Sequence, residues 1–116
     1  MSLTSVVIIK TRVITGKVVG HVLHARFQHD QHGIIHAVKC LLTTDRHVDV
    51  DSVFYFTDIE AAKKTYIVIH ASMLDQNPPE EYEGQIEAPE WLGLYDLNSF
   101  WLRSYDMKRN YELVSR

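Results

Sequence analysis

Cysteine is almost absent from this chain, since Cys40 is the only one among 116 residues. A single thiol excludes an internal disulfide and any zinc site built from several cysteines. Long apolar runs are also missing, because none approaches the roughly 20 residues with which a helix spans a bilayer, so we expect no membrane contact. The first residues include Lys10 and Arg12 instead of the apolar block of a signal peptide. These absences predict a cytoplasmic protein.

Positive charge is scarce as well, with 12 Lys and Arg residues against 15 Asp and Glu residues and a net charge of −3. No predicted element carries the dense basic stripe that neutralises phosphates, so we expect no nucleic-acid partner. Glycine-rich phosphate loops, the nucleophile elbow and the metalloprotease helix motif are missing too. We therefore predict no cofactor and assign no catalytic residue.

The composition that remains, 46% hydrophobic and 23% charged, is that of an ordinary globular protein. The length suits a single domain over residues 1–116. Stretches rich in Val, Ile, Thr and aromatic residues occupy residues 5–14, 18–28, 34–44 and 48–56. The breaks between them are short enough for hairpins, which predicts a four-stranded antiparallel meander.

A helix is predicted to follow the meander and cover it, giving an α+β fold. Thr57 and Glu60 have the spacing of a capping box. Apolar residues then recur every three or four positions, which predicts one helix over residues 58–74. Residues 65–70 also have the composition of a strand, but no helix breaker precedes Thr65, so the helix is favoured over the strand.

Residues 75–90 hold six acidic residues, no basic residue and three prolines, which predicts an exposed acidic loop. The segment after the loop is aromatic. Its large rings are Trp91, Tyr95, Phe100, Trp101, Tyr105 and Tyr111. We predict a helix over residues 96–108 whose rings either pack on the sheet or contact a partner.

Five of the seven histidines fall within residues 21–36, which raises the question of a metal site. On a helix, His29, His32 and His36 would share one face. Gly33 and the alternating pattern favour strands instead, and strands disperse the imidazoles over both faces. We predict no metal site, with His29 and His32 at a hairpin tip as the weaker alternative.

Matching apolar residues across the hairpins predicts the register of the sheet. It places a three-residue loop at residues 15–17, an even-length loop centred on residues 30–31, and a three-residue loop at residues 45–47. One inner-face row then contains Thr11, His21, Cys40 and Ser52, with His36 beside it and Tyr66 above it on the helix.

This row has two interpretations. It could bind a small molecule, or His21 could activate Cys40 as a nucleophile. Alternatively, the same groups could satisfy one another by hydrogen bonds within a packed core, which is the commoner fate of a free cysteine.

The outer face of the predicted sheet is too apolar to be bare, so either the aromatic tail or a second copy should cover it. We therefore predict a non-enzymatic interaction module that binds a protein partner or self-associates as a homodimer. The alternative is a small-molecule-binding protein or minor enzyme that uses the polar row.

Overall fold

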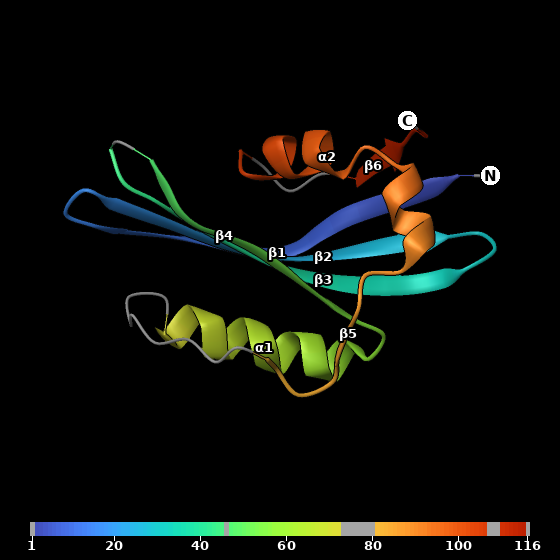
Figure 1. Ribbon diagram of the computed structural model, residues 1–116, viewed down its shortest axis with the longest axis horizontal. Helices are drawn as coiled ribbons and strands as arrows, with labels where there is room; N and C mark the ends of the chain where they lie inside the picture. Colours follow the sequence, from blue (N-terminus) through green and yellow to red (C-terminus); the bar gives the residue numbers. More distant parts are fainter. Residues whose placement is uncertain (1, 46, 73–80, 107–109, 116) are drawn as a thin grey trace.

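The computed structural model of the chain describes residues 2–45, 47–72, 81–106 and 110–115. Its elements are β1 (Leu3–Thr15), β2 (Val18–His29), β3 (Gly33–Thr43), β4 (Val48–Phe56), α1 (Ile59–Ser72), β5 (Gln85–Ile86), η1 (Glu90–Leu94), α2 (Leu97–Ser104) and β6 (Asn110–Leu113). The strands form one antiparallel sheet in the order β5-β4-β3-β2-β1-β6. The α+β class and the β1–β4 meander are confirmed (Figure 1).

The prediction of four strands is wrong, because the sheet has six. β5 adds two residues beside the end of β4, and β6 adds four beside the start of β1. Strands of this length are too short to show an alternating pattern, and their partners are distant in sequence. β5 lies inside the predicted acidic loop, of which residues 75–80 fall outside the described part of the chain.

The predicted register is wrong by one residue along the whole β2–β3 hairpin, and in the β1–β2 hairpin only from Ile9 to Thr15, because the bulge after Val7 restores the predicted pairing of Val7 with Ala25. Thr15 pairs with Val18 around a two-residue loop with Gly16 at φ +58°, and His29 pairs with Gly33 around a three-residue loop with Gly33 at φ +85°. Positive φ is inexpensive only for glycine, so these two residues fix the turns. The third hairpin pairs Cys40 with Ser52, as predicted.

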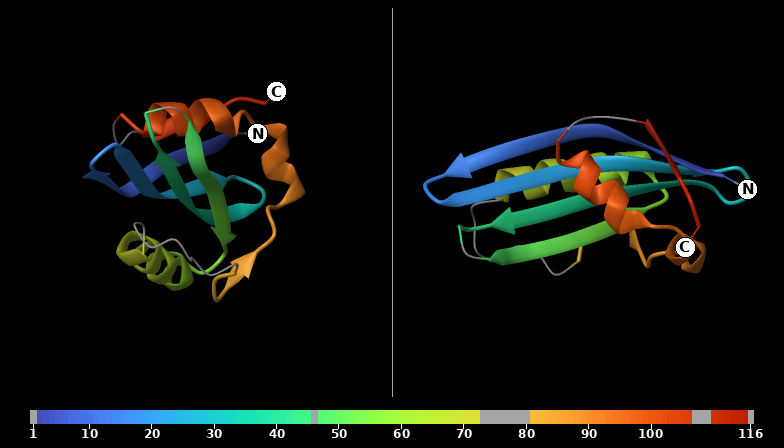
Figure 2. Two further views of the ribbon diagram at one scale, coloured as in Figure 1. Left: turned by 60° about the vertical axis from the view of Figure 1, so that its left-hand side comes forward. Right: turned by 90° about the horizontal axis from the view of Figure 1, so that it is seen from above.

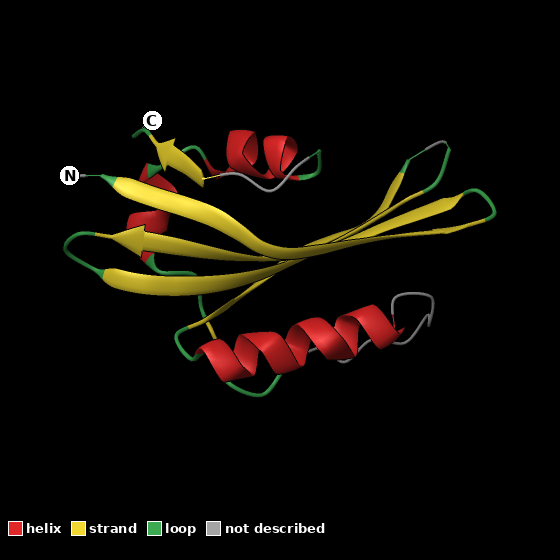
Figure 3. Ribbon diagram, turned by 180° about the vertical axis from the view of Figure 1, so that it is seen from behind, coloured by secondary structure: helices red, strands yellow, loops and turns green. Residues whose placement is uncertain are grey.

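α1 covers one face of the sheet (Figures 1 and 3). Asp58, rather than Thr57, caps it, because Asp58 Oδ1 accepts a hydrogen bond from Glu60 N at 3.0 Å. Residues 65–70 are helical, and the last two residues of the predicted helix, 73 and 74, lie outside the described residues. The core under α1, hereafter the α1-side core, consists of Val22, Val38, Cys40, Phe56, Ala62, Tyr66 and Ile69.

The aromatic C-terminal segment covers the other face, as Figure 3 and the left panel of Figure 2 show. Here Phe27 packs edge-on against both Phe100 and Trp101, with ring centroids 5.2 and 5.9 Å apart. The predicted helix over 96–108 is the shorter α2, and residues 107 and 108 are outside the described part. The outer face of the sheet was predicted to be covered by either the aromatic tail or a second copy. In this structure the aromatic tail covers it.

No helix in the described residues combines the length and apolar character needed to cross a membrane.

Candidate functional site

The predicted polar row is present on the face under α1, with one member replaced. Thr11 pairs with Val22, Val22 with Cys40, and Cys40 with Ser52. The two register errors cancel between β1 and β3, so Thr11 and Cys40 remain in line. They do not cancel for β2, so Val22 occupies the place predicted for His21, which lies on the opposite face.

The row is part of a packed core. The hydroxyl groups of Thr11 and Tyr66 are hydrogen-bonded, which joins β1 to α1. Tyr66 and Cys40 are only 7% and 8% exposed, and both belong to the α1-side core. Burial, and then the negative charge of Asp51, raises the pKa of the Cys40 thiol. With His21 on the other face, this geometry gives no activated thiolate.

A buried histidine pair lies beside the row. The Nε2 atom of His24 is 3.1 Å from Nδ1 of His36, and the two residues are 1% and 5% exposed. Burial is the main cause that lowers the pKa of both, to about 4 for His24. His36 was predicted next to the row, whereas His24 was missed because the wrong register turned it to the other face. Gly33 is the sequence feature that could have revealed the correct register, because glycine suits the positive φ found directly after a three-residue loop.

His21 instead lies near the end of α2, with its ring 5.2 Å from that of Tyr105. Among the described residues its Nδ1 atom is buried without a hydrogen-bond partner. Burial, followed by the charges of Arg12 and Lys10, lowers its pKa. Lys10 Nζ donates a hydrogen bond to the backbone oxygen of Tyr105 at 3.2 Å.

The same face holds an ion pair between a buried lysine and an exposed aspartate that the sequence did not reveal. Lys39, 8% exposed, is paired with Asp51, and its ammonium lies 5.7 Å from the centre of the Trp101 ring. A buried lysine needs such a partner because desolvation of a lone charge is costly. We interpret this pair as structural support for the packing of α2.

The histidines at the β2–β3 turn serve to hold the turn in place. His29 Nε2 is 2.9 Å from the Tyr95 hydroxyl, while its Nδ1 accepts hydrogen bonds from the backbone N–H groups of Gln31 and His32. The His32 ring stacks on Trp91 at 4.9 Å. Among the described residues, no group of three or more potential ligand side chains is arranged to hold a metal ion.

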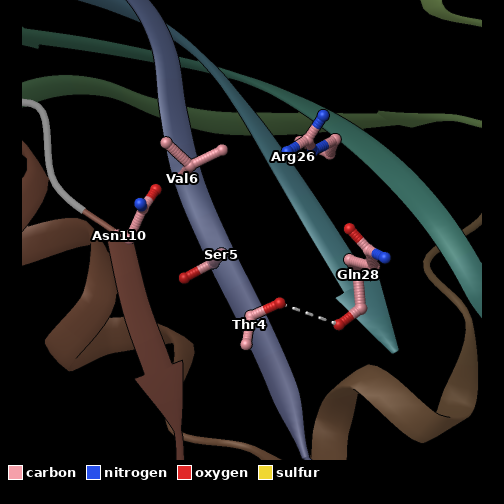
Figure 4. Close-up of a pocket in the computed structure, with 6 residues that line it drawn as sticks. All are labelled: Thr4, Ser5, Val6, Arg26, Gln28 and Asn110. Atoms are coloured by element: carbon pink, nitrogen blue, oxygen red, sulfur yellow. Dashed lines mark hydrogen bonds between the residues drawn. The ribbon is translucent and has the colours of Figure 1, made fainter. Parts of the chain in front are cut away.

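A shallow hollow of about 290 Å³ lies between β1, β2 and β6 (Figure 4). Its lining is formed by Thr4, Ser5, Val6, Arg26, Gln28 and Asn110. Thr4 Oγ1 donates a hydrogen bond to the backbone oxygen of Gln28 at 3.5 Å, which partly satisfies this polar lining. None of the predicted site residues lies in the hollow.

A second candidate binding feature is the outer edge of β1, which runs along one side of the sheet in the right panel of Figure 2. β6 pairs with β1 only from Leu3 to Val6. Within the described part of the chain, no strand pairs with residues 7–15 on the side away from β2. We call residues 9–15, which follow the bulge between Val7 and Ile9, the free edge of β1.

Comparison with models of protein families, with curated proteins and with solved structures finds no match to this chain.

Proposed function

We propose that this chain is a non-enzymatic protein-binding module that accepts an extended segment of a partner protein as a further strand along the free edge of β1. The observation that carries the proposal is the row of backbone groups in residues 9–15 that point away from β2 and pair with no described strand on that side. An exposed strand edge offers N–H and C=O groups at regular spacing and is a common template for peptide recognition.

The length of the free edge suits such a partner. Seven residues of β-strand span about 23 Å at roughly 3.3 Å per residue, which matches an ordinary strand. The two-residue loop leaves Thr15 and Val18 as a hydrogen-bonded pair, so the next residue, Ile14, turns its N–H outward. Ile14 is also 60% exposed, so a partner strand can reach this part of β1.

The opposite edge of the sheet is a poorer template. β5 pairs with β4 at Tyr55 and Phe56. Just before β5, the Tyr82 ring packs edge-on against Phe54 at 4.9 Å. This segment lies against residues 54–56 of β4 and leaves the six residues 48–53 unpaired on that side within the described chain, so β1, with seven such residues, offers the longer edge.

Self-association is not needed to bury the outer face. The dimer was expected because this face is apolar, and α2 with η1 already packs on it through Phe100, Trp101 and Leu92. In the polar row, the basis of the small-molecule alternative, Cys40 belongs to the packed α1-side core and Thr11 is hydrogen-bonded to Tyr66 of that core. Strand addition requires neither an open face nor a cavity, and it is therefore the function that we propose.

Amide hydrogen exchange on the full chain tests the proposal. The probe is a pool of capped heptapeptides that alternate valine with threonine, glutamate or lysine, added in excess. We expect slower exchange in residues 9–15 and no change in α1. A pool N-methylated at alternate residues should give no protection, because it lacks the N–H groups of a ladder.

Ile14→Pro is the matched variant, since it removes an outward N–H and leaves the β1–β2 ladder intact. We expect it to fold, as judged by circular dichroism, and to lose the protection. Protection that persists with the methylated pool, or no protection with either pool, would refute strand addition.

A further inference from the structure

We infer that the segment bound by the free edge of β1 is acidic on one face and apolar on the other, with Asp or Glu at every second position. This inference rests on the proposed function and specifies its ligand. Because successive residues of a strand point to opposite faces, an added strand would present two different sets of side chains to this edge.

The face on the α2 side of the free edge carries two cations, Lys10 and Arg12, followed by the exposed Ile14 near the turn. Lys10 is directed to this face, because its Nζ atom contacts the backbone oxygen of Tyr105 at the end of α2. Arg12, two residues later, has the same orientation and is exposed. Among the described residues, neither cation has a carboxylate within ion-pair distance, whereas Lys39 and Lys17 have Asp51 and Asp45.

A partner strand with acidic residues on this face would place carboxylates across the new ladder from Lys10 and Arg12. Opposite charges at facing cross-strand positions stabilise the pairing, and like charges destabilise it. The free edge therefore discriminates among partners by the sign of their charge.

The face on the α1 side of the free edge is apolar. Thr11 is directed to this face, because its hydroxyl is bonded to Tyr66 of α1, and Ile9, 40% exposed, lies two residues away. Val13, half-buried, continues the same face two residues after Thr11. Valine or isoleucine at the alternate positions of a bound strand would cover Ile9 and Val13.

A second copy of the chain does not fit this edge as well. Two β1 strands paired antiparallel about Thr11 would set Lys10 of one copy opposite Arg12 of the other, with like charges facing each other. Pairing of the acidic β4 of a second copy with the free edge of β1 would be hindered sterically. β5 flanks β4 and β6 flanks β1 at the same end of the sheet, because Tyr55, Ala37, Ala25 and Val7 lie in one row. A lateral approach would bring β5 of one copy onto β6 of the other.

Binding of three labelled, capped heptapeptides to the full chain, followed by fluorescence anisotropy, tests the inference. The peptides alternate valine with glutamate, with threonine or with lysine. At low salt we expect the glutamate peptide to bind about tenfold more tightly than the threonine peptide and the lysine peptide to bind most weakly. At about 0.5 M salt the three affinities should converge, because the charges are screened.

Arg12→Glu should reduce the affinity for the glutamate peptide by about tenfold and increase that for the lysine peptide. Lys64→Glu is the matched control, because it makes the same charge change on the α1 surface next to Glu83 and should leave both affinities unchanged. Thermal unfolding of each variant verifies that it is folded.

Each outcome bears on one of the two proposals. Equal binding of all three peptides, with amide protection in residues 9–15, would overturn the charge preference and leave strand addition standing. Absence of binding by any peptide would overturn both. Concentration-dependent dimerisation of the free chain with protection of β1 would identify a second copy as the occupant and overturn the acidic partner.

Discussion

His24 and His36 are hydrogen-bonded side chain to side chain, Nε2 to Nδ1, at 3.1 Å between neighbouring strands under α1. His24 pairs with Val38 in the ladder, so the two imidazoles are diagonal neighbours on one face. One ring must donate the shared proton and the other must accept it, which requires that the acceptor be neutral. The donor ring could carry an extra proton without breaking the hydrogen bond, but burial of the pair disfavours a charged imidazole there.

Acidification should destabilise the fold through this pair. Burial lowers the pKa of His24 from 6.5 to about 4, and the charges of His36 and Lys63 act in the same direction. The pKa of His36 is also lowered, by burial and then by the charge of Arg26, although the charge of Asp58 opposes this shift. The unfolded chain thus binds protons first, and the free energy of unfolding should fall as the pH drops from 6.5 towards 4.

For His24 alone, the free energy of unfolding should fall by about 3 kcal/mol over this range. Above about pH 7 the pair should contribute little to its pH dependence. Urea unfolding between pH 4 and pH 8 measures the slope. The double variant His24→Leu/His36→Leu is the control, and a slope unchanged in that variant would assign the effect to other groups.

The two histidines should also be strongly coupled at neutral pH. His24→Leu leaves the Nδ1 atom of His36 without its partner in the core, which should cost about 1–3 kcal/mol. Removing both imidazoles should cost less than the sum of the single variants, because no polar group is then left unpaired. A double-mutant cycle at pH 7.5 measures the difference, and additive effects would contradict a functional hydrogen bond.

Cys40 should resist thiol reagents in the folded protein. The thiol is 8% exposed and burial raises its pKa, so little thiolate is accessible at neutral pH. The rate of labelling should therefore follow the rate at which the protein opens and should rise steeply with urea. The fully unfolded chain serves as the reference, and fast labelling without denaturant would show that the α1-side core is open.

Gly84 should be sensitive to substitution, although it is exposed. Its φ is +82°, and a Cβ at this position would lie 2.8 Å from Cβ of Ala61 on α1. We expect Gly84→Ala to cost about 2 kcal/mol or more through backbone strain and collision. Gly93→Ala is the matched control, because a Cβ there meets no heavy atom within 4 Å. Similar melting temperatures for the two variants would refute this account.

The sequence predicted the meander, α1 and the aromatic cover, but it failed on the register of β2 for a physical reason. Val22, Leu23, His24 and Ala25 are all buried, because helices pack on both faces of the sheet. A strand that is buried on both faces shows no alternation, so apolar matching cannot decide which residues face α1. β4 begins with an alternating pattern over residues 48–51, and the pairing of Cys40 with Ser52 was predicted correctly, although a register shift at Thr43 makes the loop longer than predicted.

The candidate site was predictable only in part for the same reason. The prediction correctly brought together Thr11, Cys40, Ser52 and Tyr66. It did so because the faces of β1, β3 and β4 that lie under α1 were matched correctly at these residues. His21 and His24 exchange places with the one-residue slip of β2. The free edge of β1 could not be foreseen, because it is defined by where β6 stops, and β6 is a four-residue strand formed only by long-range pairing.

The pairing of Leu3 with Leu113 also determines when this protein can finish folding. During synthesis β1 is made about a hundred residues before β6, so the meander can form while the face later covered by Phe100 and Trp101 is still bare. Contacts between segments so distant in sequence close slowly, and exposed apolar surface invites aggregation in the interval. Until the C-terminal segment has docked, this face is therefore available for contact with other chains.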